Sequence, residues 1–183
     1  MDYLQNIKDI MKEHPGRLEH ILGVMDESIK LAEIYKLDVE KARTMALLHD
    51  VAKKIGDCTM KTYMVQGGYD LKLHHKLWHA YVGEFLALTQ YGVTDDEILK
   101  GIKWHTTGHP DMTELQKVLF VADITEKRTR LFEDARIMRE ISYKSLDEAV
   151  AYKLNYMLSN PITHHPYTTE MWEKYKKYLK GSE

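Results

Sequence analysis

The side chains best suited to chemistry in this sequence are an adjacent histidine and aspartate, His49 and Asp50, within the largely apolar stretch 45–54. An unpaired charge is strongly disfavoured in apolar surroundings, so this pair requires a partner. An imidazole nitrogen and a carboxylate together suit a borderline divalent metal such as iron, manganese or zinc. Lys53 follows His49 by four residues and shares its face if the stretch is a helix. A helix-capping role explains the dipeptide alone equally well, so the metal interpretation depends on the rest of the chain.

Four further residues, three histidines and one aspartate, occupy positions where the pattern predicts core or a helix end. They are His20, His79, His105 and Asp123. With the His-Asp pair they are spaced at intervals of 18 to 30 residues, each roughly one helix plus a connection. Antiparallel neighbours would bring such positions to one level of a helical bundle, where bundles build their metal sites. For each histidine alone a hydrogen-bonded core residue is the simpler interpretation, and their joint occurrence favours a metal centre.

The elements that must position these residues are helices, because apolar residues recur at helical spacing along most of the chain. The predicted helices span 3–11, 18–35, 39–54, 58–66, 77–91, 95–105, 115–126, 132–141, 146–158 and 168–179. Asp38, Thr94 and Thr113 are predicted to cap the helices that follow them, and Asn160-Pro161 to end another. No alternating strand pattern competes. We therefore expect an all-α fold, a single domain over residues 1–183, in which a helical bundle holds the metal site between its helices.

Composition excludes several classes of protein. No apolar run of the 183 residues approaches the ~20 residues of a transmembrane helix, and the start of the chain lacks the features of a signal peptide. We therefore expect a cytoplasmic protein with no membrane partner. The one cysteine, Cys58, excludes an intrachain disulfide. A net charge of −2 argues against nucleic acid as a partner, although a local group of arginines and lysines could still bind phosphates.

Five short motifs together carry a family resemblance. They are Arg17-Leu18-Glu19-His20, the stretch from Leu47 to Lys53, Leu77-Trp78-His79-Ala80, His105-Thr106-Thr107-Gly108, and Val121-Ala122-Asp123 with Glu126. Through them the sequence from residue 17 to about residue 172 resembles the HD superfamily of metal-dependent phosphohydrolases, and within it the YqeK branch. Members of that branch are symmetrical bis(5′-nucleosyl)-tetraphosphatases, so the resemblance implies cleavage of diadenosine tetraphosphate to two ADP.

The resemblance also implies roles for individual residues. It implies an iron ion, or manganese or another divalent ion, bound by His20, His49, Asp50 and Asp123. His79 and His105 would face the same site and contact either the substrate phosphate or a second metal ion, and Thr106 would lie beside them. A C-terminal His-Pro-x-Thr stretch borders the nucleotide in relatives, and here it reads His165-Pro166-Tyr167-Thr168.

One segment departs from the family pattern Asp-x-x-Glu-Pro-x-Arg. Here Lys127 stands at the proline and Thr129 at the arginine. Arg130 or Arg128, one residue to either side, is the expected replacement for phosphate binding, and we place Arg130 in the substrate site. Neighbouring positions on a helix point about 100° apart, so such a replacement requires an irregular segment.

The predicted chemistry is hydrolysis of a phosphoanhydride by water. A bound divalent ion polarises a phosphoryl oxygen and lowers the pKa of water. Arg17 and Lys53 would offset the charge on the equatorial oxygens, and His79 or His105 could protonate the leaving phosphate. Two other functions remain open: a different nucleotide phosphohydrolase, such as a 5′-nucleotidase or a guanosine alarmone hydrolase, and a non-catalytic nucleotide-binding sensor. The last two helices permit a homodimer.

Overall fold

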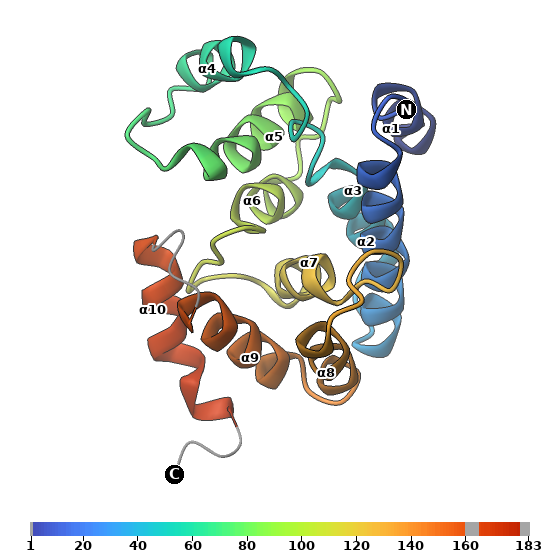
Figure 1. Cartoon of the computed structure of the whole chain (residues 1–183), viewed down its shortest axis with the longest axis vertical. Helices are drawn as coiled ribbons and strands as arrows, with labels where there is room; N and C mark the ends of the chain where they lie inside the picture. The colour runs from blue at the N-terminus through green and yellow to red at the C-terminus, as the bar shows by residue number, and fades with distance from the viewer. Residues whose placement is uncertain (1, 160–164, 180–183) are drawn as a thin grey trace.

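The computed structural model describes residues 2–159 and 165–179, and over these ranges it contains helices and no strand, which confirms the all-α expectation (Figure 1). The helices are α1 (Tyr3–Ile10), α2 (Pro15–Ile34), α3 (Val39–Leu48), α4 (Asp57–Gln66), α5 (Trp78–Thr89), α6 (Asp96–Trp104), α7 (Glu114–Thr125), α8 (Glu133–Ser142), α9 (Leu146–Ser159) and α10 (Pro166–Tyr175), with short 3₁₀ helices at His75–Leu77 and Lys176–Tyr178. The predicted stop at Asn160-Pro161 lies outside the described residues. No helix within the described ranges is long and apolar enough to cross a membrane.

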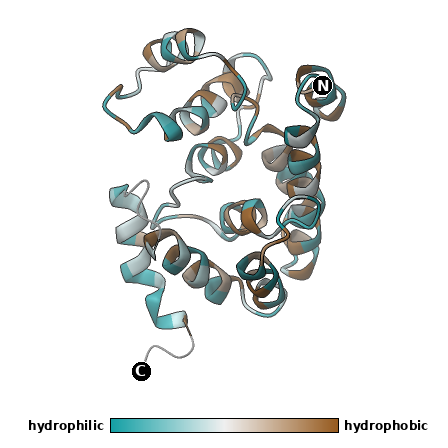
Figure 2. Ribbon diagram, viewed as in Figure 1, coloured by the Kyte–Doolittle hydropathy of each residue, from teal (hydrophilic) through white to brown (hydrophobic). Residues whose placement is uncertain are grey.

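Helix α7 forms the middle of the molecule and packs against α2, α3, α6, α8 and α9 (Figure 1). All of its residues from Leu115 to Ala122 are buried, and Figure 2 shows strongly hydrophobic colouring on this helix. A helix that is apolar on nearly every side belongs in a core rather than at a surface. Asp123 follows directly on the buried run, so the core itself brings this carboxylate to the junction with α2 and α3.

The helix starts follow local hydrogen bonding. Asp38 caps α3, and Thr113 with Gln116 forms a reciprocal capping box at α7, as expected. The predicted cap at Thr94 is wrong by one residue. Asp95 caps α6 instead, because its carboxylate accepts two backbone N–H groups of the first turn and places a negative charge at the positive end of the helix.

The segment with the His-Asp pair also departs from expectation, because α3 ends at Leu48. The Nδ1–H of His49 donates to the Ala46 carbonyl at 2.6 Å, an acceptor that the backbone N–H of Asp50 would use in a continued helix. The backbone turns more tightly instead, with the Lys53 N–H bonded to the Asp50 carbonyl at 2.9 Å. The predicted continuation of the helix is therefore wrong, since a side chain occupies the backbone acceptor that it needs.

Candidate metal centre

Two histidines, His49 and His105, are fixed in the same way at the C-terminal ends of α3 and α6. The Nδ1–H of each ring donates to the backbone carbonyl three residues earlier, Ala46 at 2.6 Å and Ile102 at 2.7 Å. A carbonyl only accepts, so Nε2 of each neutral ring carries the lone pair. Burial lowers the pKa of both imidazoles, and His49 Nε2 has no hydrogen-bond partner among the described residues. These are the properties of metal-ligating histidines oriented through their second nitrogen.

Asp50 lies between two groups of histidine nitrogens, one facing each carboxylate oxygen. Its Oδ2 lies 3.6 Å from His49 Nε2 and 3.9 Å from His20 Nε2. Its Oδ1 lies 3.4 Å from His79 Nε2 and 3.8 Å from His105 Nε2. Burial alone would raise the pKa of Asp50, but the surrounding histidines and a nearby lysine hold it well below its usual range. The charged carboxylate is therefore placed to bridge two cation positions, each formed by ligand atoms within 4.8 Å of one another.

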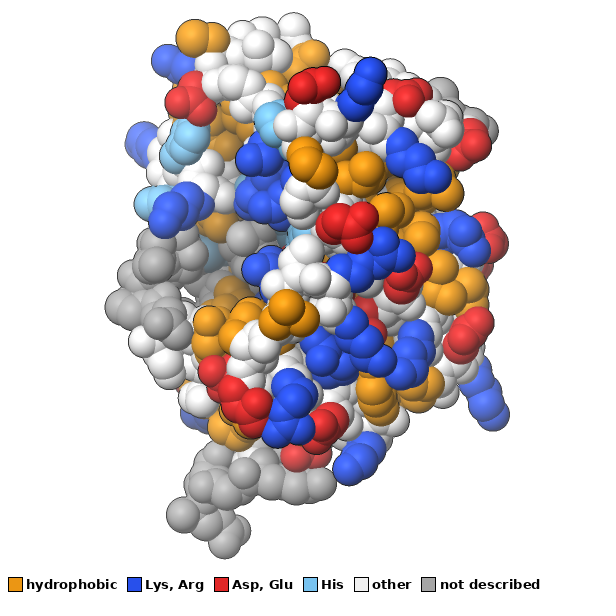
Figure 3. All heavy atoms as spheres, turned by 45° about the vertical axis from the view of Figure 1, so that its right-hand side comes forward, with side chains coloured by type: hydrophobic (Ala, Val, Ile, Leu, Met, Phe, Trp, Pro, Cys, Tyr) orange, Lys and Arg blue, Asp and Glu red, His pale blue; other side chains and the backbone are white. Residues whose placement is uncertain are grey.

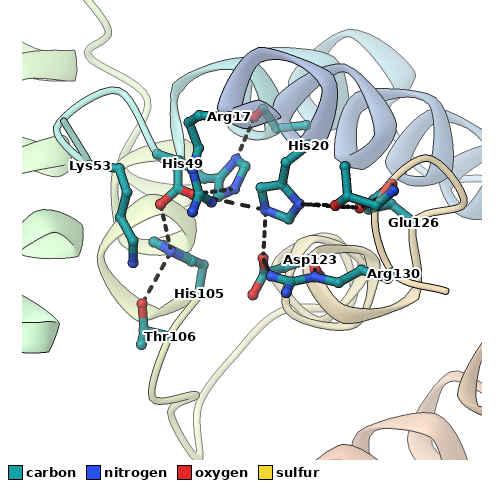
Figure 4. Close-up of polar contacts among 12 residues, drawn as sticks. Arg17, His20, His49, Lys53, His105, Thr106, Asp123, Glu126 and Arg130 are labelled. Carbon is teal, nitrogen blue, oxygen red and sulfur yellow. Dashed lines mark hydrogen bonds and ion pairs between the residues drawn. The ribbon is translucent and has the colours of Figure 1, made fainter. Parts of the chain in front are cut away.

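His20 on α2 lies between two carboxylates at the end of α7 (Figure 4). Its Nε2 is 3.1 Å from Asp123 Oδ1, and its Nδ1 is 3.3 Å from Glu126 Oε1. Glu126 is fully buried and also accepts the backbone N–H of Thr129 at 3.0 Å. Burial lowers the pKa of His20, but the hydrogen bonds with the two carboxylates more than offset this and raise it above its usual value. Glu126 thus orients the ring, a role that only its place in the family motif could have suggested.

Asp123 lies beside His20 but belongs to neither of the two ligand groups around Asp50. A buried lysine from α9, Lys153, places its Nζ 3.6 Å from Asp123 Oδ2 and donates to the Phe120 carbonyl at 2.5 Å. Burial would raise the pKa of Asp123, yet the hydrogen bond with His20 and the charge of Lys153 hold it well below its usual range. Asp123 therefore carries its charge at the edge of the centre. The sequence pattern did not reveal Lys153, whose position on α9 looks like ordinary core spacing.

A further set of polar contacts surrounds His79 on α5. Lys53 Nζ lies 3.0 Å from His79 Nε2, which requires a lone pair on that nitrogen because an ammonium only donates. His105 Nε2 lies 3.3 Å from the same atom, and Thr106 Oγ1 is 3.1 Å from His105 Nε2. Burial lowers the pKa of His79 to about 4, so both imidazoles are neutral at neutral pH. Two facing lone pairs suit a cation between them and argue against the predicted proton donation by either histidine.

Of the two candidate arginines after α7, Arg130 faces the centre and Arg128 does not. Arg130 Nε donates to the Asp123 carbonyl at 3.0 Å, and its Nη2 lies 3.5 Å from Asp123 Oδ1. Arg128 forms surface ion pairs with Glu19 at 3.0 Å and with Asp26 at 2.8 Å. Because the chain after α7 is an irregular loop, Arg130 can point toward the centre from the position next to Thr129. A continued helix would turn its side chain about 100° away.

The residues expected to border a nucleotide at the start of α10 have different surroundings. Thr168 is buried, and its hydroxyl donates to the Thr107 carbonyl at 2.7 Å, so it anchors α10 to the loop after α6. Tyr167 is half-buried with its ring centre 4.3 Å from that of His109, and Pro166 is exposed at the first position of the helix. Tyr167 and Pro166 are thus open to a ligand, whereas the protein itself uses the Thr168 hydroxyl.

The donor set around Asp50 fits a divalent transition metal. The two ligand groups consist of imidazole nitrogens and a carboxylate, with no cysteine sulfur among their members in the described part of the chain. That combination suits iron, manganese or zinc. Arg17 lies at the edge of the same centre and donates from Nη1 to Asp50 Oδ2 at 2.5 Å, where a guanidinium can also reach a bound phosphate.

Known proteins resemble this chain over nearly its whole length. The HD domain family matches residues 17–128, a range that contains every candidate ligand described above. A symmetrical bis(5′-nucleosyl)-tetraphosphatase from Bacillus subtilis is 33% identical over 180 residues, 96% of this chain and 95% of the relative. A protein of the same name from Staphylococcus aureus is 33% identical over 156 residues, 80% of this chain and 79% of the relative.

The fold has a counterpart among solved structures. The crystal structure of a predicted HD superfamily hydrolase involved in NAD metabolism, from Clostridium acetobutylicum, superimposes with a TM-score of 0.81 at 30% identity. The similarity covers 94% of this chain and 96% of the other. The matched family range, the identity with full-length relatives and the shared fold lead to one conclusion: the chain belongs to the HD domain family, in the branch of the symmetrical bis(5′-nucleosyl)-tetraphosphatases.

Proposed function

We propose that this protein is a metal-dependent hydrolase that cleaves diadenosine tetraphosphate symmetrically to two ADP. The observation that carries the proposal is a centre in which Asp50 faces two groups of histidines, with Arg17 and Arg130 at its edge. Cationic side chains around metal ligands fit a substrate that is rich in phosphate. Relatives that match over nearly the whole chain are named for this reaction.

We infer that the centre binds iron, with manganese as the alternative, in two positions that share Asp50. One position has His20 and His49 as its nitrogen ligands, and the other has His79 and His105. Elemental analysis of protein purified without oxygen should give two metal ions per chain, and one in His79→Ala. A single ion in the wild type would contradict the second metal position. The Lys53 ammonium would then be the cation beside His79 and His105.

The chain's own residues bind and neutralise the phosphates. An ion at this centre supplies Lewis acidity toward a phosphoryl oxygen and lowers the pKa of the attacking water. Arg17 and Arg130, held beside Asp50 and Asp123, can bind phosphate oxygens as planar forks and offset the charge that builds during bond cleavage. Lys53, whose Nζ reaches His79, adds a point charge on the other side of the centre.

Product analysis tests the proposal. Iron-loaded protein should convert diadenosine tetraphosphate to ADP alone, whereas ATP plus AMP would reject symmetrical cleavage. In oxygen-18 water one ADP per cleavage should carry the label, because one water enters and no covalent enzyme intermediate forms.

The other candidate functions give different results in the same experiment. Phosphate release from a nucleoside monophosphate, with the dinucleotide untouched, would indicate a 5′-nucleotidase, and preferential turnover of a guanosine polyphosphate would indicate an alarmone hydrolase. Tight ADP binding without turnover would indicate a sensor. The homodimer and the cytoplasmic location stay predictions.

A further inference from the structure

An open pocket of about 270 Å³ adjoins the metal centre at the N-terminal end of α2. His20 lines this pocket and also presents Nε2 to the centre, so the two spaces share a wall. Arg17 and Arg130 line it as well, and Figure 4 shows their side chains close to His20. The pocket extends past these residues to Lys54, which the proposed function does not yet use.

The lining of the pocket is cationic. Arg17, Lys54 and Arg130 line it, with Arg17 and Arg130 paired to Asp50 and Asp123 of the centre, and the described lining itself contains no aspartate or glutamate. Lys54 is exposed and forms no ion pair with a described residue, so its charge is not neutralised by a fixed partner. The first turn of α2, which begins at Pro15, adds the positive end of a 20-residue helix. Figure 3 shows lysine and arginine side chains gathered beside a hollow on this face. Such a pocket attracts an anion of more than one charge.

The proposed substrate has phosphates that the metal centre alone does not neutralise. Attack in line with the leaving group places the attacking water and the leaving oxygen on opposite sides of the reacting phosphorus. The departing ADP therefore extends away from that phosphorus, and its two phosphates gain charge as the bond breaks. A cationic pocket that shares a wall with the centre is suited to receive them.

We propose that Lys54, together with Arg17, Arg130 and the first turn of α2, forms the subsite for the phosphates of the departing ADP. This inference rests on the proposed function and adds to it the residue that recognises the second half of the substrate. Lys54 binds these phosphates as a point charge and thereby favours a dinucleotide over a substrate whose leaving group carries no phosphate.

The test compares two substrates that share the reacting phosphorus and one ADP half. Diadenosine tetraphosphate carries a second ADP, whereas the β-(4-nitrophenyl) ester of ADP carries an uncharged aryl group in its place. The variant Lys54→Met removes the charge and keeps most of the side-chain length. In iron-loaded full-length protein the ratio of kcat/KM for the dinucleotide to kcat/KM for the ester should fall about tenfold, the scale of one lost charged hydrogen bond.

Two further variants show that the effect belongs to this charge in this place. Lys54→Arg should largely restore the ratio, and Lys61→Met, which removes an exposed lysine from α4 outside the pocket lining, should not change it. An unchanged ratio in Lys54→Met would overturn the subsite and leave the proposed function standing. Failure of the wild type to cleave diadenosine tetraphosphate would refute the proposed function, and the subsite with it.

Discussion

Replacing Gly23 with alanine tests how the protein orients His20. Gly23 lies on α2 against Glu126, and a Cβ at this position would be 2.2 Å from Glu126 Oε2 and 2.9 Å from its Cδ. Contacts this short do not occur, so the carboxylate has to move. Glu126 is fully buried and is held by the backbone N–H groups of Arg128 and Thr129. Moving it disrupts the 3.3 Å contact between Oε1 and His20 Nδ1.

The substitution affects the free energy of unfolding and the metal affinity by different amounts. Alanine stabilises a helix interior by ~1 kcal/mol relative to glycine, and overpacking a filled space costs ~1–3 kcal/mol. The free energy of unfolding of metal-free Gly23→Ala should therefore fall by no more than ~2 kcal/mol. Loss of a carboxylate that orients a ligating histidine lowers metal affinity ~10–100-fold, or ~1.4–2.7 kcal/mol. The variant should fold and yet bind metal distinctly more weakly.

Titration of metal-free protein with Fe²⁺ or Mn²⁺, combined with thermal unfolding of the same samples, measures both effects. Gly56→Ala is the matched control, because a Cβ there meets nothing within 4 Å and the backbone φ of −66° suits alanine. It should keep the wild-type affinity. Wild-type metal affinity in Gly23→Ala would refute the inference that Glu126, which packs against Gly23, orients the His20 ring for metal binding.

Three other changes have expected outcomes. Asp50→Ala should remove the metal, since this carboxylate faces both ligand groups, and full occupancy by elemental analysis in this variant would contradict the centre. Arg130→Ala should lower kcat/KM for diadenosine tetraphosphate ~10–100-fold, the scale of a hydrogen bond to a charged group. Arg128→Ala, which removes only surface ion pairs, should stay near the wild type, and equal losses in the two variants would count against the assignment of Arg130. Burial lowers the pKa of Lys153 from 10.5 to about 8 in the folded protein, so between these values the unfolded chain binds the extra proton and stability rises with pH. The unfolding free energy of metal-free wild type minus that of metal-free Lys153→Met should therefore increase by up to ~3 kcal/mol from pH ~8 to ~10.5. A constant difference over this range would show that Lys153 has an ordinary pKa.

Helix positions and candidate ligands could be predicted because their signals are local. Apolar spacing and the caps at Asp38 and Thr113 act within a few residues, so they are visible in the sequence. An ionisable residue on an apolar helix face is conspicuous for the same reason, so the sequence predicts His20 and Asp123 as candidate ligands on helices far apart in the chain. Thr94 and Asp95 both suit a cap, and only the backbone path selects the second.

The sequence by itself determined which residue types and which helices could build the centre, and tertiary structure decided where the side chains point. Helix α3 ends where the His49 ring donates a hydrogen bond to the Ala46 carbonyl. The spacing of apolar residues in the sequence gives no sign of this hydrogen bond. The choice of Arg130 over Arg128 depends on an irregular loop, where no helical repeat relates neighbouring side chains. Glu126 meets His20 across 106 residues of sequence, because α2 packs against α7. Directions and contacts of this kind arise only when distant helices pack together, so no local pattern could have predicted them.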